Sequence, residues 1–216
     1  MNRIIKIYEI LEETQPTYEE TEHEWMTNGL SATPFKHLVS CALSTVTTTS
    51  RTVKACKALY AEAQSFDDIR NLSDEKLTGL IKPVAHYNRK VQTLKKMCAK
   101  IVDEYDNHIP DTKEELLKLP GIGQKCANLM MNYKYQKPVI AVDTHIHRVV
   151  NRLGIVSAST HDKSAEQLND ITPDQFKTHA HEWLISVGMN ICKPRKPRCA
   201  ECPVSAYCDY YRQHAA

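Results

Sequence analysis

The sequence predicts an all-α protein, and three observations support that fold class. Segments in which Val, Ile or Thr alternate with polar residues, as in a half-buried strand, are rare along the chain. Apolar residues instead recur at three- and four-residue intervals, as they do on the buried face of a helix. The 6 glycines and 10 prolines mostly separate these helix-like segments. We therefore expect helices joined by short turns, grouped in two lobes.

The first half of the chain contains most of the expected helices. Residues 4–11 form the first, because Ile4, Ile7 and Leu11 fall on one helical face. Residues 13–34 are polar and acidic, and no element is assigned to them. Further helices are expected over 34–43 and 49–61, from Ser65, after the capping residue Ser73, and over the amphipathic segment 88–105.

The second half opens with a signal for a helix start. Thr112, followed three residues later by Glu115, has the spacing of a capping box. Pro120 and Gly121 end the helix that this box starts. Further helices are expected from near Gly123, over 144–153 and over 173–187.

Length and composition bound the class of protein. A chain of 216 residues that is 42% hydrophobic can bury a sizeable core in one or two domains. The mean hydropathy of −0.47 and the lack of a long apolar run exclude a membrane span. The first residues lack the apolar stretch of a secretory signal. We therefore expect an intracellular protein whose 8 cysteines are not joined in disulfides.

The net charge of +2 hides a segregation of charge along the chain. Residues 1–30 sum to −5, whereas residues 118–152 sum to +5 and residues 190–212 to +3. Two basic segments suit a polyanionic partner bound on one face. Charge alone does not decide between that partner and a solvated surface on which cations cluster by chance.

A candidate anion site lies between two of the expected helices, at Gly121-Ile122-Gly123. Two glycines flanking one aliphatic residue permit a tight turn, because glycine tolerates positive φ and leaves its N–H group bare. Those N–H groups and the start of the next helix can hold a DNA phosphate without reading a base. We expect Ile122 to pack back between the helices. Taken alone, the pattern favours an ordinary helical corner whose glycines only permit the turn.

Lys125 falls in the first turn of the helix that follows, where a cation opposes the helix dipole. A purely structural helix would favour Asp or Glu there. The lysine is therefore a phosphate contact, a solvated surface residue, or an amine kept neutral. A neutral amine is a nucleophile that can form a Schiff base with a sugar carbon.

Asp143 follows four apolar residues and precedes an expected helix. On its own it reads as an N-cap. A carboxylate held beside apolar surroundings can also stabilise positive charge that develops on a sugar as a base leaves. The presence of Lys125 in the same chain favours this second interpretation.

Four cysteines near the C-terminus can enclose one metal centre: Cys192, Cys199, Cys202 and Cys208. Thiolates bind zinc or iron–sulfur clusters, and zinc sites usually show two close cysteine pairs. Only one close pair occurs here, so the spacing disfavours a zinc ribbon. The other four cysteines lie on apolar helix faces and are expected in the core: Cys41, Cys56, Cys98 and Cys126.

The segment between the first two of these cysteines is basic and stiffened by two prolines. Its cations suit the phosphates of a nucleic acid backbone and are Lys193, Arg195, Lys196 and Arg198. A metal centre with a purely structural role is compatible with this loop binding DNA.

The chain resembles endonuclease III, the iron–sulfur branch of the helix–hairpin–helix DNA glycosylases. Three motifs carry the resemblance in combination: LPGIGQK, VDTHIHRVVNRLG and C-x6-C-x2-C-x5-C. The resemblance covers roughly residues 34–212 and is specific because order and spacing both agree. It implies a [4Fe–4S] cluster on the four C-terminal cysteines. It also implies two lobes, with residues 27–137 as a helical barrel and 1–26 plus 138–216 as the cluster domain.

The resemblance further implies base excision repair of double-stranded DNA that contains damaged bases, mostly oxidised pyrimidines, or abasic sites. Lys125 would attack C1′ of a flipped nucleotide, displace the base and allow β-elimination of the 3′ phosphate. Asp143 would be the essential carboxylate, facing Lys125 across a cleft. We expect a monomer in the cytoplasm, associated with the nucleoid if the source is bacterial.

The sequence departs from the family where residues enter the opened duplex. The family commonly has Gln at the position of Val46, Asp at that of Thr49 and Leu at that of His86. Val46 cannot hydrogen-bond an orphaned base, and His86 is a different wedge. We therefore expect a changed lesion or opposite-base preference, or a glycosylase activity weaker than the lyase activity.

Three alternatives remain open at the level of sequence. A monofunctional glycosylase for another lesion would not need Lys125. A non-catalytic iron–sulfur protein that binds DNA or senses redox state would not need both Lys125 and Asp143. A zinc-binding interaction protein would lack the visible absorbance of iron.

Overall fold

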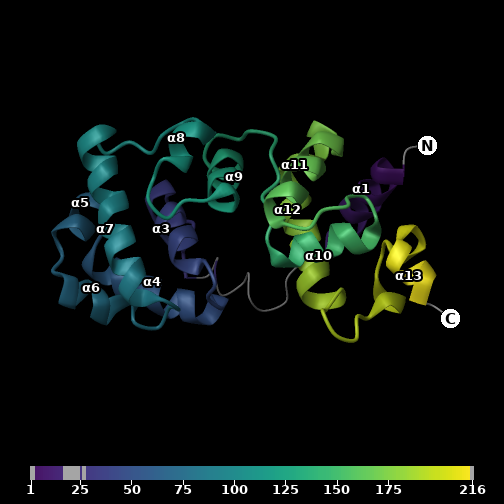
Figure 1. Ribbon diagram of the computed structural model, residues 1–216, viewed down its shortest axis with the longest axis horizontal. Helices are drawn as coiled ribbons and strands as arrows, with labels where there is room; N and C mark the ends of the chain where they lie inside the picture. The colour runs from purple at the N-terminus through teal and green to yellow at the C-terminus, as the bar shows by residue number, and fades with distance from the viewer. Residues whose placement is uncertain (1–2, 17–24, 26–27, 215–216) are drawn as a thin grey trace. The chain divides into compact units, whose positions relative to one another are not determined.

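The computed structural model describes residues 3–16, 25 and 28–214, and every regular element in these ranges is helical (Figure 1). The chain divides into two compact units. One combines Met1–Tyr18 with Gln136–Ala216 and is called the cysteine unit; the other, Glu19–Tyr135, is called the hairpin unit. The predicted all-α, two-lobed class is confirmed. No helix within the described ranges is long and apolar enough to cross a membrane.

The hairpin unit is built around its longest helix, which packs against three others. Its fully buried side chains include Leu38, Leu59, Ile69, Leu77, Met97 and Ile101. The elements in chain order are α3 Pro34–Ser44, α4 Thr49–Glu62, α5 Phe66–Asn71, α6 Asp74–Ile81, α7 Tyr87–Glu104, α8 Lys113–Leu117 and α9 Gln124–Tyr133. The expected helices therefore all occur, with ends shifted by one or two residues where an end was predicted. Part of the unassigned segment 13–34 lies outside the described residues.

The expected capping box at the start of α8 is only half formed. Thr112 Oγ1 accepts a hydrogen bond from the backbone N–H of Glu115 at 3.3 Å. The Glu115 carboxylate does not bond back to Thr112. It accepts instead from the Tyr105 hydroxyl at 2.7 Å and pairs with Lys118. Because the Glu115 carboxylate bonds to Tyr105 and Lys118 instead, the second hydrogen bond of the capping box does not form.

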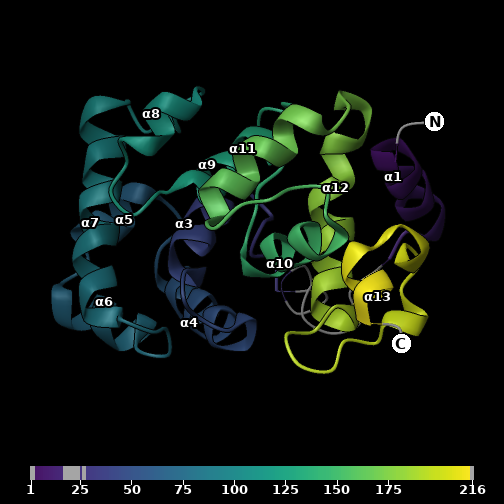
Figure 2. The same cartoon turned by 45° about the vertical axis from the view of Figure 1, so that its right-hand side comes forward.

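The cysteine unit joins the first helix of the chain to its last segments. Tyr8 is fully buried here, stacks on Phe176 with ring centroids 5.3 Å apart and hydrogen-bonds Thr172 at 3.0 Å. Arg3 pairs with Asp209 at 2.9 Å, which joins the start of α1 to the start of α13, the last helix of this unit (Figure 2). The elements are α1 Arg3–Thr14, α10 Thr144–Leu153, α11 His161–Ile171, α12 Asp174–Ser186, a π-helical turn Val187–Ile191, short 3-10 turns Cys199–Glu201 and Ser205–Tyr207, and α13 Asp209–His214.

Candidate active site and metal centre

The hairpin between α8 and α9 requires glycine at its first position. Gly121 has φ +83°, and a Cβ there would lie 2.5 Å from Thr93 Cγ2. Gly123 differs, because its φ of −105° is open to any residue and a Cβ would meet nothing within 4 Å. The expectation of a glycine-permitted turn therefore holds at Gly121 alone. At Gly123 the missing side chain leaves open space in front of α9.

The start of α9 has the properties of an anion site. Gly123 is its N-cap and supplies no side-chain hydrogen bond. The first N–H groups of a helix have no partner within the helix, so those of Gln124 and Lys125 are available to a ligand. Ile122 is 6% exposed and donates its N–H to Leu119 O at 3.1 Å. Its expected packing back between the helices is confirmed.

Lys125 is the second residue of α9 and its side chain is half-buried. Among the described residues its amine forms neither an ion pair nor a hydrogen bond. Two buried thiols lie beneath it, and Cys41 hydrogen-bonds Cys126. That bond raises the pKa of Cys41 and lowers the pKa of Cys126, with the charge of Lys125 lowering both. The amine thus lies near buried thiols and has no carboxylate partner among the described residues.

The loops that carry Val46 and His86 both project into solvent. Val46 is 82% exposed and His86 is also exposed. Each has φ +55°, in the left-handed region. For a β-branched residue such as valine that conformation is an outlier, with a cost on the order of 1–3 kcal/mol. Neither packing nor local backbone preference therefore explains an apolar side chain at the tip of this loop.

Lys90 ties the two loops together within the hairpin unit, and sequence reasoning missed it. Its Nζ donates to Leu43 O and Thr45 O at 2.7 Å each, and to Thr47 Oγ1 at 3.1 Å. Thr47 Oγ1 also accepts from the N–H of Ala85 at 3.1 Å. Burial lowers the pKa of Lys90 to about 8. Its position inside a run of cations in α7 gave no signal of this role.

Asp143 is the N-cap of α10, as the simpler sequence interpretation predicts. Its Oδ1 accepts from the N–H groups of His145 at 2.8 Å and Ile146 at 2.9 Å. Its Oδ2 accepts no hydrogen bond from the described residues. The side chain is half-buried, while Val142 and Ala141 before it are buried. One carboxylate can therefore fix the helix with one oxygen and present the other to a substrate.

The segment leading into Asp143 is held by side chains that the sequence analysis did not identify. Asn169 bonds both backbone groups of Ile140, accepting from N–H at 2.7 Å and donating to the carbonyl at 2.9 Å. His181 Nδ1 lies 2.8 Å from Ala141 O. His147 packs α10 on α11 through Ser164 Oγ at 2.7 Å. Burial, and next His161, lower its pKa.

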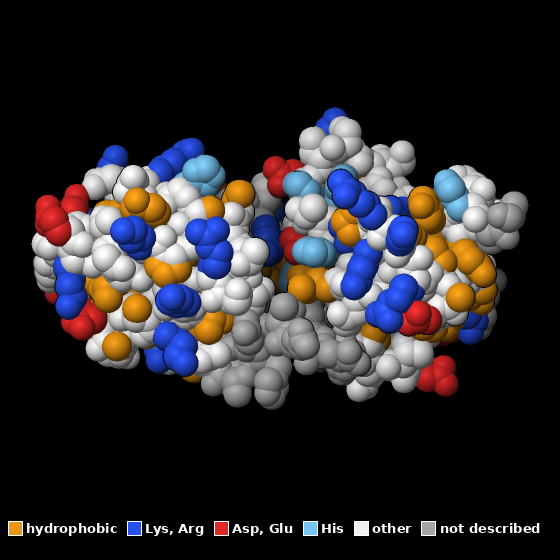
Figure 3. Space-filling view, turned by 90° about the horizontal axis from the view of Figure 1, so that it is seen from below, with side chains coloured by type: hydrophobic (Ala, Val, Ile, Leu, Met, Phe, Trp, Pro, Cys, Tyr) orange, Lys and Arg blue, Asp and Glu red, His pale blue; other side chains and the backbone are white. Residues whose placement is uncertain are grey.

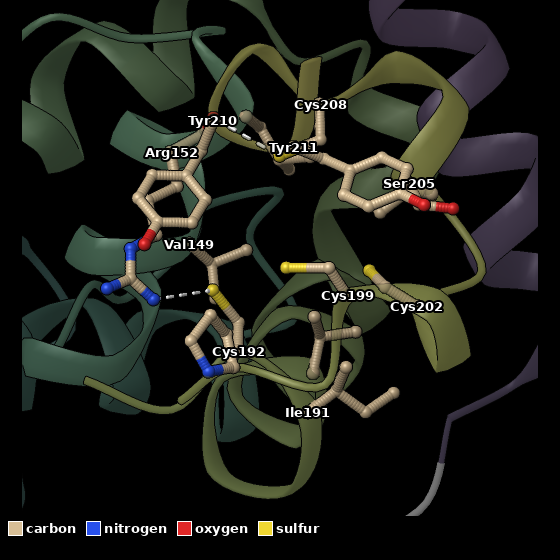
Figure 4. Close-up of a pocket in the computed structure, with 14 residues that line it drawn as sticks. Val149, Arg152, Ile191, Cys192, Cys199, Cys202, Ser205, Cys208, Tyr210 and Tyr211 are labelled. Carbon is tan, nitrogen blue, oxygen red and sulfur yellow. Dashed lines mark hydrogen bonds between the residues drawn. The ribbon is translucent and has the colours of Figure 1, made fainter. Parts of the chain in front are cut away.

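The four C-terminal cysteines line one cavity of the cysteine unit (Figure 4). Apolar side chains form much of the remaining wall, namely Val149, Leu153, Val187, Ile191 and Val204. No three metal-binding side chains among the described residues lie close enough together to hold a single ion. Sulfurs spread around an apolar cavity suit a multi-iron cluster rather than one zinc ion. Burial, and after it the neighbouring sulfurs, raise the pKa of Cys202 to about 11.

Two arginines of α10 hold the chain at the first of these cysteines. Arg152 Nη1 donates to Cys192 Sγ at 3.4 Å and to Lys193 O at 2.7 Å, and its Nη2 donates to Pro194 O at 3.0 Å. Arg148 Nε donates to Cys192 O at 2.8 Å. These bonds fix the loop that carries the basic residues.

The basic loop keeps three of its four expected cations available. Lys193, Arg195 and Lys196 are exposed and form no ion pair with any described residue. Arg198 differs, because it pairs with Glu201 at 2.9 Å and donates to Asn190 O at 2.8 Å. Figure 3 shows basic side chains gathered on this part of the cysteine unit.

The hairpin and the cysteine cavity both correspond to known families. The HhH-GPD superfamily of base excision DNA repair proteins matches residues 39–174, and the iron–sulfur binding domain of endonuclease III matches residues 192–208. Together they define an iron–sulfur, helix–hairpin–helix DNA repair protein. Endonuclease III of Rickettsia conorii is 35% identical over 95% of both chains, and that of Thermotoga maritima is 36% identical over 86% of this chain and 87% of its own. The chain belongs to the endonuclease III family.

Solved structures agree with this assignment. A non-covalent endonuclease III–DNA complex is 27% identical, with a TM-score of 0.87, over 100% of this chain and 99% of that one. The protein is thus a base excision repair enzyme, a DNA glycosylase with the abasic-site lyase activity of its family. The expected [4Fe–4S] cofactor is confirmed, because the iron–sulfur domain spans the cysteine segment. These findings overturn the zinc-protein and non-catalytic alternatives.

Replacing one of the four C-terminal cysteines is expected to remove the iron. Cys199→Ser should abolish visible absorbance, lower bound iron to background and destabilise the cysteine unit, because the cavity then holds incompatible polar groups. Cys98→Ala is the control, since Cys98 is also a cysteine but lies buried in the hairpin unit, away from the cysteine cavity. Iron content and thermal unfolding would be measured on both. Full iron in Cys199→Ser would contradict its assignment as a ligand.

Proposed function

We propose that Lys125 is the nucleophile and Asp143 the catalytic carboxylate of this enzyme, acting on oxidised pyrimidines and abasic sites in double-stranded DNA. The observation that carries the proposal is the Lys125 amine, which has no acid partner among the described residues and stands beside an uncapped helix start. A phosphate held there would bring a sugar within reach of the amine. A structure named as a trapped endonuclease III–DNA covalent intermediate, 28% identical with a TM-score of 0.79, supports such an adduct.

The proposed chemistry begins with attack by the unprotonated form of the Lys125 amine, the form that carries a free electron pair. Lys125 Nζ forms a bond to C1′ as the bond from C1′ to the base breaks, and the base leaves with that electron pair and takes up a proton. Opening of the sugar ring gives an imine between Nζ and C1′. Loss of a C2′ proton then expels the 3′ phosphate, and water releases the lysine. Asp143 stabilises the positive charge on the sugar through Oδ2 while Oδ1 keeps its hold on α10.

The other predicted site residues take supporting roles in the proposal. The hairpin Gly121-Ile122-Gly123 presents the free N–H groups at the start of α9 to a phosphate. The basic loop binds further phosphates through Lys193, Arg195 and Lys196, whereas Arg198, the fourth predicted cation, stays paired with Glu201. The cluster ligands are Cys192, Cys199, Cys202 and Cys208. We retain 27–137 as the barrel domain, 1–26 plus 138–216 as the cluster domain, and a monomer as the working form.

Borohydride trapping tests this function directly. The purified protein, incubated with an abasic-site duplex and borohydride, is expected to form an adduct that survives denaturation, because reduction fixes the imine. Without borohydride the same duplex should be cleaved on the 3′ side of the abasic site. Binding without an adduct or cleavage would contradict the proposal and favour a monofunctional glycosylase.

The lesion preference is proposed to differ from that of relatives with Gln and Leu in the two exposed loops. Fold does not settle it, since a thymine-DNA glycosylase only 22% identical shares the fold with a TM-score of 0.81. Val46 can fill a gap in the duplex but cannot hydrogen-bond the base left unpaired. His86 can stack on that base or bond to it. The residue that hydrogen-bonds the opposite base is then His86 rather than Val46.

Exchanging the loop residues tests that preference. Val46→Gln with His86→Leu is expected to change the ratio of excision rates among opposite bases several-fold, because hydrogen-bonding capacity moves from one loop to the other. Single-turnover excision of an oxidised pyrimidine would be measured opposite each base. Lyase activity on a preformed abasic site is the internal control, since no base remains to be excised. The proposed change of preference would be refuted by two results together. The ratio of excision rates among opposite bases would be the same in the variant and the wild type, and the wild-type rates would equal those of a relative with Gln and Leu in these loops.

A further inference from the structure

We infer that α4 carries an additional DNA-contact surface, formed by Arg51, Lys54 and Lys57 and here called the α4 stripe. This inference rests on the proposed function, because it extends the binding site of the same duplex. Its partner is the phosphate backbone beside the damaged nucleotide, contacted by charge without any base being read.

The stripe has the dimensions of a backbone contact. Its residues are spaced by three and are all exposed, whereas Val53, Cys56 and other residues of α4 face the core. Six residues of helix span about 9 Å. One strand of duplex DNA advances about 3.4 Å per phosphate along its axis. Three cations over that length can therefore meet two or three phosphates of one strand.

The stripe is uncompensated in a unit that otherwise pairs many of its cations. Arg70 lies 2.7 Å from Asp103, Lys76 3.2 Å from Glu62, and Lys100 2.5 Å from Glu104. No member of the α4 stripe forms an ion pair with any described residue. Figure 3 shows basic side chains spread over one face of the hairpin unit and acidic ones gathered toward its edge. An ordinary solvated face mixes both signs, so this separation favours a polyanion.

The stripe is continuous with the two exposed loops of the same unit. The loop with Val46 runs directly into the start of α4 at Thr49. Arg51 Nε donates to Pro83 O at 2.6 Å, which ties the first cation of the stripe to the loop that carries His86. A duplex opened by these loops would have its backbone next to Arg51. The remaining two lysines continue along the helix away from the opening.

The salt dependence of binding tests the stripe. The variant is Arg51→Gln with Lys54→Gln and Lys57→Gln, which keeps good helix formers on α4. The probe is a duplex with a stable abasic-site analogue, titrated over a range of salt concentrations. Each lost phosphate contact lowers the slope of log affinity against log salt by about 0.9. We expect the slope to fall by about 2–3, with the largest loss of affinity at low salt.

A variant with the same change of charge elsewhere is the matched control. Arg70→Gln with Lys76→Gln and Lys100→Gln removes one arginine and two lysines that are already paired, and should leave the slope within about 0.5 of wild type. An equal fall in both variants would show only a general effect of net charge and would overturn the inference. An unchanged slope in the α4 variant would overturn it as well.

Failure of the stripe and failure of the proposed function give different results. The α4 variant, saturated with duplex at low salt, should still form the borohydride adduct, because the stripe does not touch the reacting sugar. A slope loss without any adduct in the wild type would keep the stripe but reject Lys125 as nucleophile. A normal adduct in the wild type, with no loss of slope in the α4 variant, would support Lys125 as nucleophile and reject the stripe.

Discussion

Lys125→Ala is expected to eliminate the borohydride-stable adduct and strand cleavage, while the protein still binds an abasic-site duplex. The substitution removes the amine that forms the imine, so the loss of adduct and cleavage should be complete rather than partial. The hairpin proposed to bind phosphate uses backbone N–H groups, which this substitution leaves unchanged. Because the side chain is half-buried and its amine makes no hydrogen bond to a described residue, stability should change by about 0.5 kcal/mol or less.

The informative control for this experiment is Lys90→Met. Burial lowers the pKa of Lys90 to about 8, so near neutral pH it holds a larger neutral fraction than an ordinary lysine and is a rival nucleophile. Its three hydrogen bonds instead assign it to holding the exposed loops. Lys90→Met should keep the adduct on abasic DNA and slow excision of damaged bases. An adduct that disappears with Lys90 and persists in Lys125→Ala would reverse the two roles.

The fold was predictable where a local signal and the core coincide. The Asn88–Tyr105 prediction lies within one residue of α7, because its apolar residues recur with helical spacing and Val91, Leu94 and Ile101 are indeed buried. The segment that forms α11 was missed, since only three of its residues are buried and two of them are Ser164 and Ala165. A short buried face leaves too weak a periodic signal to see in sequence.

The candidate site divides in the same way. Gly121, Lys125 and the four C-terminal cysteines were found because their residue types carry chemistry at a fixed spacing. Lys90, Arg152 and Asn169 were not found, because each acts on backbone far away in sequence. Asn169 reaches Ile140 across 29 residues, and Arg152 reaches Lys193 across 41. No spacing rule within one segment encodes such a contact.

Asp143→Asn is expected to separate the two roles of this side chain. Asparagine is as good an N-cap as aspartate, so its amide oxygen can still accept from the N–H groups of His145 and Ile146. The fold should remain intact. The negative charge is lost, and base excision should slow on the order of 100-fold or more, because nothing then offsets the positive charge on the sugar.

Asp143→Ala provides the comparison, because it removes the cap together with the charge. It should lose activity to a similar degree and also destabilise the protein by about 1 kcal/mol, the usual cost of an N-cap. Thermal unfolding and single-turnover excision, measured on both variants, resolve the two contributions. If Asp143 only capped α10, Asn would keep activity and Ala would lose activity in proportion to stability. Wild-type excision by the folded Asp143→Asn variant would therefore remove the carboxylate from the mechanism and leave it a purely structural residue.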